Sequence, residues 1–523
     1  MSLTIVINKR VNRYSERLKM MRYILGIDIG TTAIKATVVG EDGAVHGEAT
    51  CEYELTTLPT GEVEAELKLY EDAFEHAIKE AVRSSEADKK DIKCVGFSST
   101  AETCVFLDKD YKPLCKVIAW MDMRGTKEAE YLTKQFSQKE IISKVGFDSI
   151  YAIHPVSKIL AVKNKSPEVF EKTRMFAQIK DYFVYVLSGK FITEHSVASD
   201  HGFFDITNRC YWKEMLELVG IDEQYLPEMT EPGKEIGKIT PEAAEKYGLD
   251  TETMINIGAF DQACGAIGAG NIKAGIASES TGSALVTVAT IDQLSPDSEG
   301  TVPTLCSGIP GKYIYQPYCT GSIIMKWYRD TFCEMEKNIE LETGVNAYTQ
   351  MDALVDETNP GADGLIMLPY FQGSGIPELN EKASGVYYGI NAGHTRGHFI
   401  RAIMEGLAIA LKRMLECEKE LGATMTEIRS LGGGAKSEAW CQIKADILEI
   451  PVKVIKNSGS TPGMGCAILA GVANGIWSSV EEAADKFVEI KKTYYPNPEN
   501  RKVYEDVYKK YIEITKALNP TFS

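Results

Sequence analysis

The sequence predicts an α/β protein built from two domains. Its 523 residues exceed the roughly 150 residues of an average domain, so more than one folded unit is expected. Short apolar runs typical of strands alternate with segments of helical periodicity, which is the pattern of α/β layers. The alternation starts again after Ile255, so two α/β halves are the simplest interpretation. With 44% hydrophobic and 25% charged residues, the chain has the composition of a folded globular protein.

Residues 1–21 precede the first apolar run and are rich in lysine and arginine. They contain neither an apolar core of roughly 7–15 residues nor a small-residue cleavage site, so a secretory signal is not expected. We predict an N-terminal extension here, with Met20 or Met21 as an alternative start.

The first predicted domain covers residues 22–257 and opens with three apolar runs. They lie at Ile24–Ile29, Ile34–Val39 and Val45–Tyr53, and Glu41-Asp42-Gly43 supplies a turn, so a β-meander is expected. Later elements alternate between helical and strand patterns, at Leu67–Arg83 (helix), Cys94–Phe97 (strand), Cys104–Leu107 (strand) and after Gly125 (helix).

The second predicted domain covers residues 258–523. A glycine-rich strand and turn precede Ser278–Thr290, and helical patterns follow at Gly397–Cys417 and Ser437–Leu448. The segment from Pro227 to Gly248 carries proline and glycine and is the least regular stretch between the halves, which places the boundary just beyond it, near Ile257.

Charge and cysteine usage exclude several classes of protein. The formal net charge of −17 repels polyphosphate backbones, so nucleic acid is not an expected partner. The twelve cysteines show no C-x-x-C pair and no zinc-site spacing, which favours free thiols and a cytoplasmic protein. The longest uncharged apolar run, Gly463–Trp477, is shorter than the ~20 residues that a membrane span requires, so no membrane partner is expected.

A turn with glycine and two hydroxyl residues follows the first apolar run. It reads Asp28-Ile29-Gly30-Thr31-Thr32 and is followed by Lys35. Glycine and hydroxyls suit a tight turn whose amides face a phosphate, and an aspartate beside phosphate is reasonable when Mg²⁺ lies between them. The alternative is an ordinary β-turn in which Asp28 makes an Asx hydrogen bond.

A second turn of this kind, Ser280-Thr281-Gly282-Ser283, lies between apolar strands of the other half. Two such turns, each heading the first hairpin of an α/β half, suggest phosphate-binding loops that face one another across a cleft between the domains.

A third glycine-rich segment, Gly432-Gly433-Gly434-Ala435-Lys436-Ser437, leads into an amphipathic helix. Glycines permit close approach to a flat ligand or a phosphate, and a helix N-terminus adds partial positive charge. A plain flexible loop is the alternative. The dinucleotide fingerprint G-x-G-x-x-G is not met, because Ser437 stands where the last glycine is required.

Asp261 lies among small and apolar residues, in Gly258-Ala259-Phe260-Asp261-Gln262. Such surroundings raise the pKa of a carboxyl group and suit a general base. A helix N-cap is the alternative, and the two roles are compatible.

Taken together, these motifs resemble the FGGY carbohydrate kinase family, from Tyr23 to about Tyr495. The family's C-terminal signature is matched by Gly385-Val386-Tyr387-Tyr388-Gly389-Ile390, then His398-Phe399, then Ala402-Ile403-Met404-Glu405. The Asp28 turn, Trp120–Arg124, Asp261-Gln262, Leu368-Pro369-Tyr370 and the triple glycine occur in the family's order.

The resemblance implies a two-domain, ribonuclease-H-like (actin-like ATPase) fold with an interdomain catalytic cleft. It further implies transfer of the γ-phosphate of Mg-ATP to a hydroxyl of a sugar or polyol. The first domain would be the sugar-binding side with the first phosphate hairpin, and the second the nucleotide-binding side with the catalytic aspartate. A homodimer is the assembly that the resemblance suggests.

Residue by residue, the resemblance assigns the following roles. Asp261 would be the catalytic base, and Asp28 would face the metal. The expected substrate-binding residues are Ala101, Glu102, His154, Asp261 and Gln262. The expected nucleotide-binding residues are Gly30, Thr31, Thr32, Lys35, Gly282, Ser283, Gly432, Gly433, Gly434 and Ser437.

Departures from the family's patterns leave the substrate open. Ala101 stands where glycerol kinases carry arginine, and Thr100-Ala101-Glu102 replaces the Met-His-Gly of xylulokinases. Length and layout resemble the xylulokinase branch, so a ketopentose such as xylulose is the leading expectation. Glycerol, erythritol, ribulose and fuculose are alternatives, and so is an actin-like nucleotide switch that transfers no phosphate to a sugar.

Overall fold

A computed structural model describes residues 21–294, 300–456 and 458–522. The chain divides into two compact units. Unit 1 contains the described residues up to Gly268, together with Leu305–Gly311 and Ser460–Phe487. Unit 2 contains the rest, from Ala269 to Thr304, from Lys312 to Gly459 and from Val488 onward. The predicted extension, residues 1–21, lies almost wholly outside the described residues.

Unit 1 is built on a six-stranded mixed sheet with the order β14-β15-β6-β1-β2-β3. The predicted meander is confirmed as β1 (Tyr23–Ile29), β2 (Ala33–Gly40) and β3 (Val45–Glu52), which pair antiparallel in sequence. On the other side of β1, the strands β6 (Ile92–Ser99) and β15 (Met254–Phe260) run parallel to it and to each other, and β14 (Glu235–Lys238) closes the edge. The carboxyl ends of β1, β6 and β15 therefore meet at one edge of the sheet.

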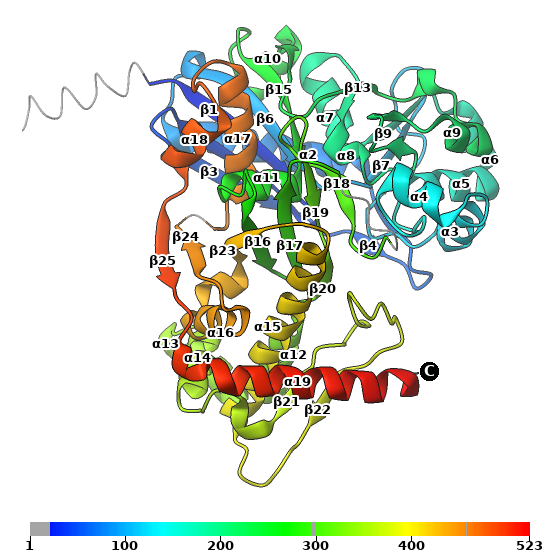
Figure 1. Ribbon diagram of the computed structural model, residues 1–523. Helices are drawn as coiled ribbons and strands as arrows, with labels where there is room; N and C mark the ends of the chain where they lie inside the picture. Colours follow the sequence, from blue (N-terminus) through cyan, green and yellow to red (C-terminus); the bar gives the residue numbers. More distant parts are fainter. Residues whose placement is uncertain (1–20, 295–299, 457, 523) are drawn as a thin grey trace, which may run out of the picture. The chain divides into compact units, whose positions relative to one another are not determined.

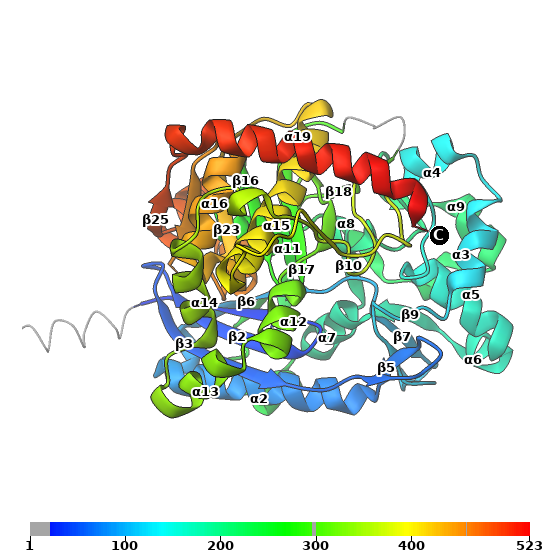
Figure 2. The same ribbon diagram turned by 90° about the horizontal axis from the view of Figure 1, so that it is seen from below.

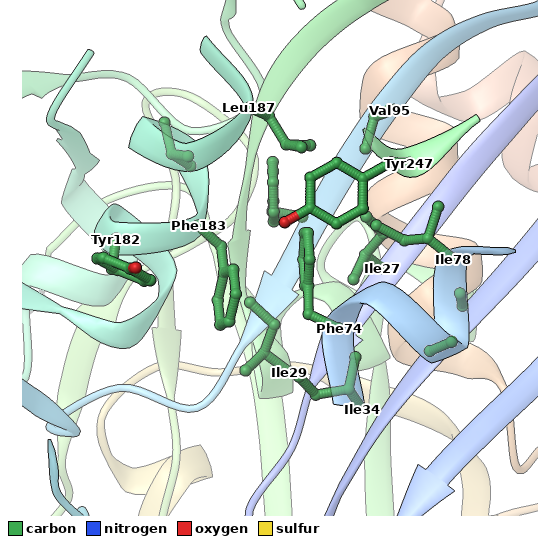
Figure 3. Packing of buried hydrophobic residues seen from close by; sticks show 14 of the residues in the cluster. Ile27, Ile29, Ile34, Phe74, Ile78, Val95, Tyr182, Phe183, Leu187 and Tyr247 are labelled. Atoms are coloured by element: carbon green, nitrogen blue, oxygen red, sulfur yellow. The ribbon is translucent and has the colours of Figure 1, made fainter. Parts of the chain in front are cut away.

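One face of this sheet carries the main hydrophobic core of unit 1. Helix α2 (Leu67–Ser85) packs along β2 and β3, as Figure 2 shows, and α7 (Ile179–Ser188) and α10 (Pro241–Tyr247) pack beside it. Phe74 of α2 stacks on Phe183 of α7, with ring centroids 4.1 Å apart, and meets the edge of Tyr247 (Figure 3). The alternate residues Ile27 and Ile29 of β1 point into this cluster, as the period of two in a strand requires.

The opposite face of the sheet is covered by α17 (Thr461–Ala473), which returns from far along the chain to lie beside β1 (Figure 1). The contact is made possible by glycine in the strands: a Cβ at Gly26 would lie 2.2 Å from the carbonyl oxygen of Gly463, and one at Gly96 would lie 2.4 Å from that of Cys466. Helix α17 also packs on α11 (Asp261–Gly268).

This division differs from the predicted single boundary at residue 257. Strand β15 pairs with β6 inside the first sheet, and α11 packs on α17, so the chain leaves unit 1 only after Gly268. Asp261 consequently lies in unit 1 rather than in the second predicted domain, 258–523. The return of Ser460–Phe487 has no local signal in the sequence, because it depends on contacts between residues far apart in the chain.

The rest of unit 1 forms a second, five-stranded sheet with the order β4-β5-β8-β7-β9, surrounded by short helices. Its strands are β4 (Thr56–Thr57), β5 (Val63–Ala65), β8 (Val117–Ile118), β7 (Cys104–Leu107) and β9 (Met175–Gln178). The helices include α3 (Thr126–Thr133), α4 (Gln138–Val145), α5 (Pro155–Lys165), α6 (Pro167–Lys172), α8 (His195–Ala198) and α9 (Lys213–Val219). Two strand pairs, β10 (Ile192–Glu194) with β13 (Glu228–Thr230) and β11 (Phe204–Asp205) with β12 (Cys210–Tyr211), complete it.

Unit 2 repeats the central arrangement of unit 1. Its sheet includes the order β19-β17-β16-β23-β24-β25, in which β16 (Gly275–Thr281) forms a hairpin with β17 (Ala284–Ile291) and runs parallel to β23 (Met425–Gly432). The outer strands are β19 (Tyr313–Tyr315), β20 (Tyr318–Thr320), β24 (Val452–Ile455) and β25 (Ile490–Tyr494). Each unit thus places a hairpin beside a parallel strand.

The hydrophobic core of unit 2 lies between helices and the short pair β21 (Ile366–Leu368) and β22 (Val386–Tyr388). The helices are α12 (Ile323–Phe332), α13 (Glu334–Thr343), α14 (Ala347–Asp356), α15 (Arg396–Glu420), α16 (Glu438–Leu448) and α19 (Arg501–Leu518). Near the end of α15, Glu418 is fully buried and accepts a hydrogen bond from the Thr287 hydroxyl at 2.8 Å. Among the described residues, no helix combines the length and the apolar character needed to cross a bilayer.

Candidate active site

The tip of the β1–β2 hairpin gathers the first set of predicted residues. Asp28 lies opposite Lys35 across the hairpin, and its carboxylate accepts a hydrogen bond from Ser98 Oγ of β6 at 2.8 Å. This donor belongs to a neighbouring strand and not to a turn amide. Burial raises the pKa of Asp28, while the bond from Ser98 and the charge of Lys35 oppose the rise.

The turn itself is tight and presents hydroxyl groups. The Gly30 amide donates to the carbonyl oxygen of Ala33 at 3.0 Å, and a Cβ at Gly30 would lie 3.1 Å from that oxygen. Thr31 Oγ1 accepts a hydrogen bond from the Trp120 indole at 2.8 Å, and Thr32 is exposed. The five residues predicted around this phosphate loop are therefore neighbours.

Asp261 is delivered to the same edge of the sheet by a distortion of β15. The pairing of β15 with β6 shifts register between Asn256 and Ala259, where Gly258 has φ of 63°. A Cβ at Gly258 would lie 1.6 Å from the carbonyl oxygen of Phe97, so only glycine fits. The strand bends there and Asp261 begins α11.

The Asp261 carboxyl group is buried and not fully hydrogen-bonded. Within the part of the chain that the structure describes, its Oδ1 atom has no hydrogen-bond partner. Burial raises its pKa well above the ordinary value, the charges of Asp28 and Glu102 add to the rise, and hydrogen bonds from the backbone and side chain of Gln262 oppose it. A carboxyl group with a raised pKa and a free oxygen has the properties of a general base.

Glu102 lies on the loop that follows β6 and adopts a left-handed backbone with φ of 57°. Lys158 of α5 holds this loop: its ammonium donates to the carbonyl oxygens of Glu102 at 2.8 Å, Ala119 at 2.9 Å and Trp120 at 2.8 Å. Burial raises the pKa of the Glu102 carboxyl to about 7, and the charge of Lys158 opposes this rise. Ala101, beside it, is fully buried.

His154 precedes α5 and is fully buried. Its Nδ1 accepts a hydrogen bond from the Tyr151 amide at 3.2 Å, and burial lowers its pKa to about 3. The neutral ring therefore carries its proton on Nε2, which is buried and has no partner.

Asp200 and His201 lie in the same region, and the sequence analysis did not single them out. Both are buried, and among the residues that the structure describes, Asp200 Oδ2 and both ring nitrogens of His201 have no hydrogen-bond partner. Burial raises the pKa of Asp200 well above its ordinary value, and the charges of Glu102 and Asp261 contribute. The available signal was an acid and a histidine inside the apolar run around Val197 and Phe203, but no motif marks it.

A chain of hydrogen bonds fixes the backbone just before Asp261. Lys180 and Glu194 form a fully buried ion pair. Glu194 accepts from both the amide and the hydroxyl of Ser196 at 2.7 Å, and Ser196 Oγ accepts from the Phe260 amide at 2.9 Å. This arrangement links the α7 and α8 region to the start of α11.

Unit 2 contains the remaining predicted residues. Gly282 and Ser283 form the β16–β17 turn, whose carbonyl oxygens accept hydrogen bonds from the amides of Ser322 (2.8 Å) and Gly321 (3.0 Å). Thr281, the last residue of β16, pairs with Gly432 of β23, and a Cβ at Gly434 would lie 2.7 Å from Thr281 Cβ. The Gly282–Ser283 turn and the Gly432–Gly434 segment are therefore neighbours within unit 2.

A buried polar cluster lies under these two loops. Glu279 accepts from Lys444 Nζ at 2.6 Å, from Thr281 Oγ1 at 2.6 Å and from the Ser430 hydroxyl, and Lys444 also donates to Thr281 Oγ1 at 2.9 Å. Ser437 caps α16 by accepting from the Trp440 amide at 3.0 Å, and its hydroxyl donates to Asp352 at 2.9 Å. Ser437 thus has a structural role at the helix N-terminus.

Asp28 is the predicted metal-facing residue. Within the part of the chain that the structure describes, no three or more His, Cys, Asp or Glu side chains come together as a metal site. The hard oxygen of Asp28 fits a Mg²⁺ ion that is held mainly by phosphate groups and water, as Mg²⁺ commonly is in phosphoryl-transfer sites.

Comparison with known proteins identifies the family of the chain. Residues 23–268 match the N-terminal domain of the FGGY family of carbohydrate kinases, and residues 310–474 match the C-terminal domain of that family. The chain is 31% identical to a xylulose kinase from Bacillus subtilis over 503 residues, covering 95% of this chain and 98% of the relative. It is 28% identical to a gluconokinase from the same species over 510 residues, covering 96% and 98%.

The same similarity extends to solved structures. A ligand-bound xylulose kinase from Lactobacillus acidophilus superposes with a TM-score of 0.87 at 25% identity, covering 96% of this chain and 99% of that one. The predicted two-domain actin-like fold is thereby confirmed.

Proposed function

The chain belongs to the FGGY family of carbohydrate kinases, and from this premise we propose that it transfers the γ-phosphate of Mg-ATP to a hydroxyl group of a ketopentose such as xylulose. The observation that carries the proposal is the buried, unpartnered Oδ1 of Asp261, beside Glu102 and within reach of the charge of Asp28.

In this proposal Asp261 is the catalytic base. An alcohol is a weak nucleophile, so a carboxylate that takes its proton during in-line attack accelerates the transfer by typically ~10²–10⁴. The free oxygen of Asp261 is available to accept that proton. The surrounding acids favour the protonated form once the proton has arrived, which assists its transfer.

The hairpin tip of unit 1 would bind the transferred phosphate. Amides and hydroxyls of Gly30, Thr31 and Thr32 suit phosphate oxygens, and Lys35 offsets their charge. Mg²⁺ bound with ATP neutralises the charge that develops on the phosphates, and Asp28 is the residue that would face it.

The loops of unit 2 would bind the rest of the nucleotide. Gly282 and Ser283 would contact phosphate, and Gly432, Gly433 and Gly434 would allow close approach of the adenosine. Ser437 would act by fixing the start of α16, since its hydroxyl already serves Trp440 and Asp352.

The sugar would lie among Ala101, Glu102, His154, Asp261 and Gln262. Xylulose is our leading substrate because xylulose kinases are among the most similar relatives, and gluconate is the second candidate because a gluconokinase matches over the same length. The family membership makes a nucleotide switch without sugar transfer the less favoured reading.

A coupled ADP-release assay with Mg-ATP tests the proposal. D-xylulose, L-xylulose, both ribuloses, fuculose, glycerol, erythritol and gluconate would be compared at equal concentration, and we expect one strong responder. Asp261→Asn is expected to lower kcat by about 10²-fold or more while ATP binding, followed by calorimetry, stays intact. Silence with every acceptor, or full activity of the variant, contradicts the proposal.

A further inference from the structure

We infer that Asp200 and His201 determine which acceptor this kinase uses, by binding hydroxyl groups of a neutral ketose or polyol and by excluding acceptors that carry a carboxylate. The inference rests on the proposed function and narrows its substrate class. Neither residue belongs to the motifs that carry the family resemblance.

The first support is unsatisfied hydrogen-bonding capacity in a buried place. Asp200 is 5% exposed and His201 is 2% exposed, yet Asp200 Oδ2 and both nitrogens of His201 have no partner. Buried polar side chains are nearly always hydrogen-bonded, and leaving one unpaired costs about 1–3 kcal/mol. Three such atoms on consecutive residues indicate a place where a polar ligand supplies the missing partners.

The second support is their position beside the proposed base and the predicted sugar residues. Helix α8 ends two residues before Asp200 and is bonded to the residue before Asp261, since Ser196 Oγ accepts from the Phe260 amide at 2.9 Å; the charges of Glu102 and Asp261 also act on Asp200. His201 lies beside His154: its carbonyl oxygen accepts from the Val156 amide at 3.1 Å. A Cβ on the next residue, Gly202, would lie 3.3 Å from His154 Nδ1. The pair therefore belongs to the surroundings of Asp261, not to a separate region of unit 1.

The chemistry of these atoms matches vicinal hydroxyl groups. Asp200 Oδ2 accepts a hydrogen bond, a neutral His201 donates through one nitrogen and accepts through the other, and His154 donates through Nε2. A sugar hydroxyl can both donate and accept, so successive hydroxyls on one chain of carbons can satisfy all of these atoms.

The same region, as far as the structure describes it, offers an anionic acceptor no positive charge to pair with. The charges of Glu102 and Asp261 act on Asp200, and that of Glu102 acts on Asp261, so these carboxyl groups resist a further negative charge whichever of them is ionised. The two cations that act on these acids and histidines are already engaged. Lys158 donates to three carbonyl oxygens, and Lys180 is paired with Glu194.

An aldonate would therefore place its carboxylate in a buried environment where both of these described lysines already have other partners, which is costly. A neutral ketose or polyol meets no such penalty. The relatives include a xylulose kinase and a gluconokinase, and the cost of burying a carboxylate favours the xylulose kinase activity, because xylulose is uncharged.

Steady-state kinetics on the full-length enzyme test the inference. For the wild type we expect kcat/KM with D-gluconate to be at least about 100-fold below that with the best neutral acceptor. Asp200→Asn and His201→Gln are each expected to raise KM for the neutral acceptor by about 10- to 100-fold while KM for ATP changes less than twofold.

Two variants control for buried polar groups outside the predicted sugar residues. Asp181 is a fully buried acid whose Oδ2 accepts from the Gln178 amide at 2.8 Å, while its Oδ1 has no hydrogen-bond partner among the described residues. His195 is a buried histidine whose Nδ1 lies 3.2 Å from a carboxylate oxygen of Glu231. Asp181→Asn and His195→Gln should leave KM for the acceptor unchanged.

Acceptor binding to the wild type gives a readout that does not depend on the variants' folding. Thermal-shift titration with the best neutral acceptor should raise Tm, and titration with D-gluconate should not. Gluconate turnover equal to that with neutral acceptors, an equal shift by gluconate, or unchanged acceptor KM in both folded variants would overturn this inference alone. Absence of turnover with every acceptor would overturn the proposed function itself.

Discussion

Replacing Lys158 with methionine should both destabilise unit 1 and weaken acceptor binding. The lysine side chain is completely buried, and its ammonium donates three hydrogen bonds of 2.8–2.9 Å to carbonyl oxygens on two different loops. Methionine fills a similar volume but donates nothing, so all three carbonyl groups lose a charged donor; the Ala119 oxygen keeps the Asp122 amide and the Glu102 oxygen keeps the Cys104 thiol.

The size of the effect follows from the three lost hydrogen bonds. Each hydrogen bond from a charged group contributes about 1.5–3 kcal/mol, and removing the ammonium recovers part of its own cost of burial. We expect a net loss of about 3–5 kcal/mol in the free energy of unfolding, which is the range measured when one partner of a buried charged interaction is removed. Such a loss is a large fraction of the stability of an ordinary domain.

Function should suffer through Glu102. Its left-handed backbone, with φ of 57°, is unfavourable for a non-glycine residue and is held by the bond from Lys158 to its own carbonyl oxygen. Without that bond, we expect KM for the acceptor to rise about tenfold or more.

Urea unfolding followed by circular dichroism measures the first effect and steady-state kinetics the second. Lys163→Met is the matched control: Lys163 lies on the same helix but is partly exposed and donates to one carbonyl oxygen, that of Val219, at 2.6 Å. The control should lose about 1 kcal/mol or less. A Lys158→Met protein whose unfolding free energy lies within 1 kcal/mol of the wild type would refute the reasoning.

Three further predictions concern other parts of the chain. Gly258→Ala should give little folded protein, because its Cβ would lie 1.6 Å from a carbonyl oxygen. The control Gly248→Ala, whose Cβ would have no atom within 4 Å, should cost about 1 kcal/mol of stability. Soluble yield and circular dichroism compare the two variants, and equal behaviour would contradict the prediction. Burial raises the pKa of Glu418 to about 8, above its value in the unfolded chain, so its contribution to stability is lost as pH rises from about 4.5 to 8. Glu418→Gln should therefore gain stability relative to the wild type as pH rises from 5 to 8, by up to about 1.4 kcal/mol per pH unit in thermal unfolding, and a pH-independent difference would argue against it. Lys444→Met removes the cation that donates to Glu279 and Thr281 under the two glycine-containing loops of unit 2. This variant should raise KM for ATP about tenfold with a smaller change in kcat. An unchanged KM for ATP would show that Lys444 does not position these loops.

The parts of the site that could be predicted from the sequence are those formed by neighbouring residues. The turn after Asp28 and the turn at Gly282 are set by glycine and hydroxyl residues within a few positions, and both lie at hairpin tips as expected. Asp261 was recognisable because small residues surround it in the chain.

Other residues of the site depend on contacts that no local pattern contains. Lys158 is an ordinary helical lysine in the sequence, and its role appears only when three distant carbonyl groups converge on it. Asp200 and His201 become notable only when burial removes their access to water. The return of α17 onto β1 requires the missing side chains of Gly26 and Gly96, whose purpose cannot be recognised before the partner helix is known.

The topology of the sheets explains why the candidate residues of each unit come together. In unit 1, Asp28 lies at the carboxyl end of β1, Glu102 follows β6, and Asp261 follows β15. Because these three strands are parallel neighbours, their carboxyl ends lie side by side, and loops leaving that edge share one space, which is where ligands bind in parallel sheets.

The same rule holds within unit 2, where Thr281 ends β16 and Gly432 ends its parallel neighbour β23. The residue at the end of each strand can be read from the sequence, but the lateral order of the strands cannot. Asp261 illustrates the consequence. Its small and apolar neighbours in the sequence marked it as a candidate base. Its place in unit 1 became known only from the pairing of β15 with β6 and from the bulge at Gly258, which sets the direction of the chain before Asp261. The position of Asp261 thus depends on one glycine, Gly258, whose backbone conformation no other residue can adopt in that place.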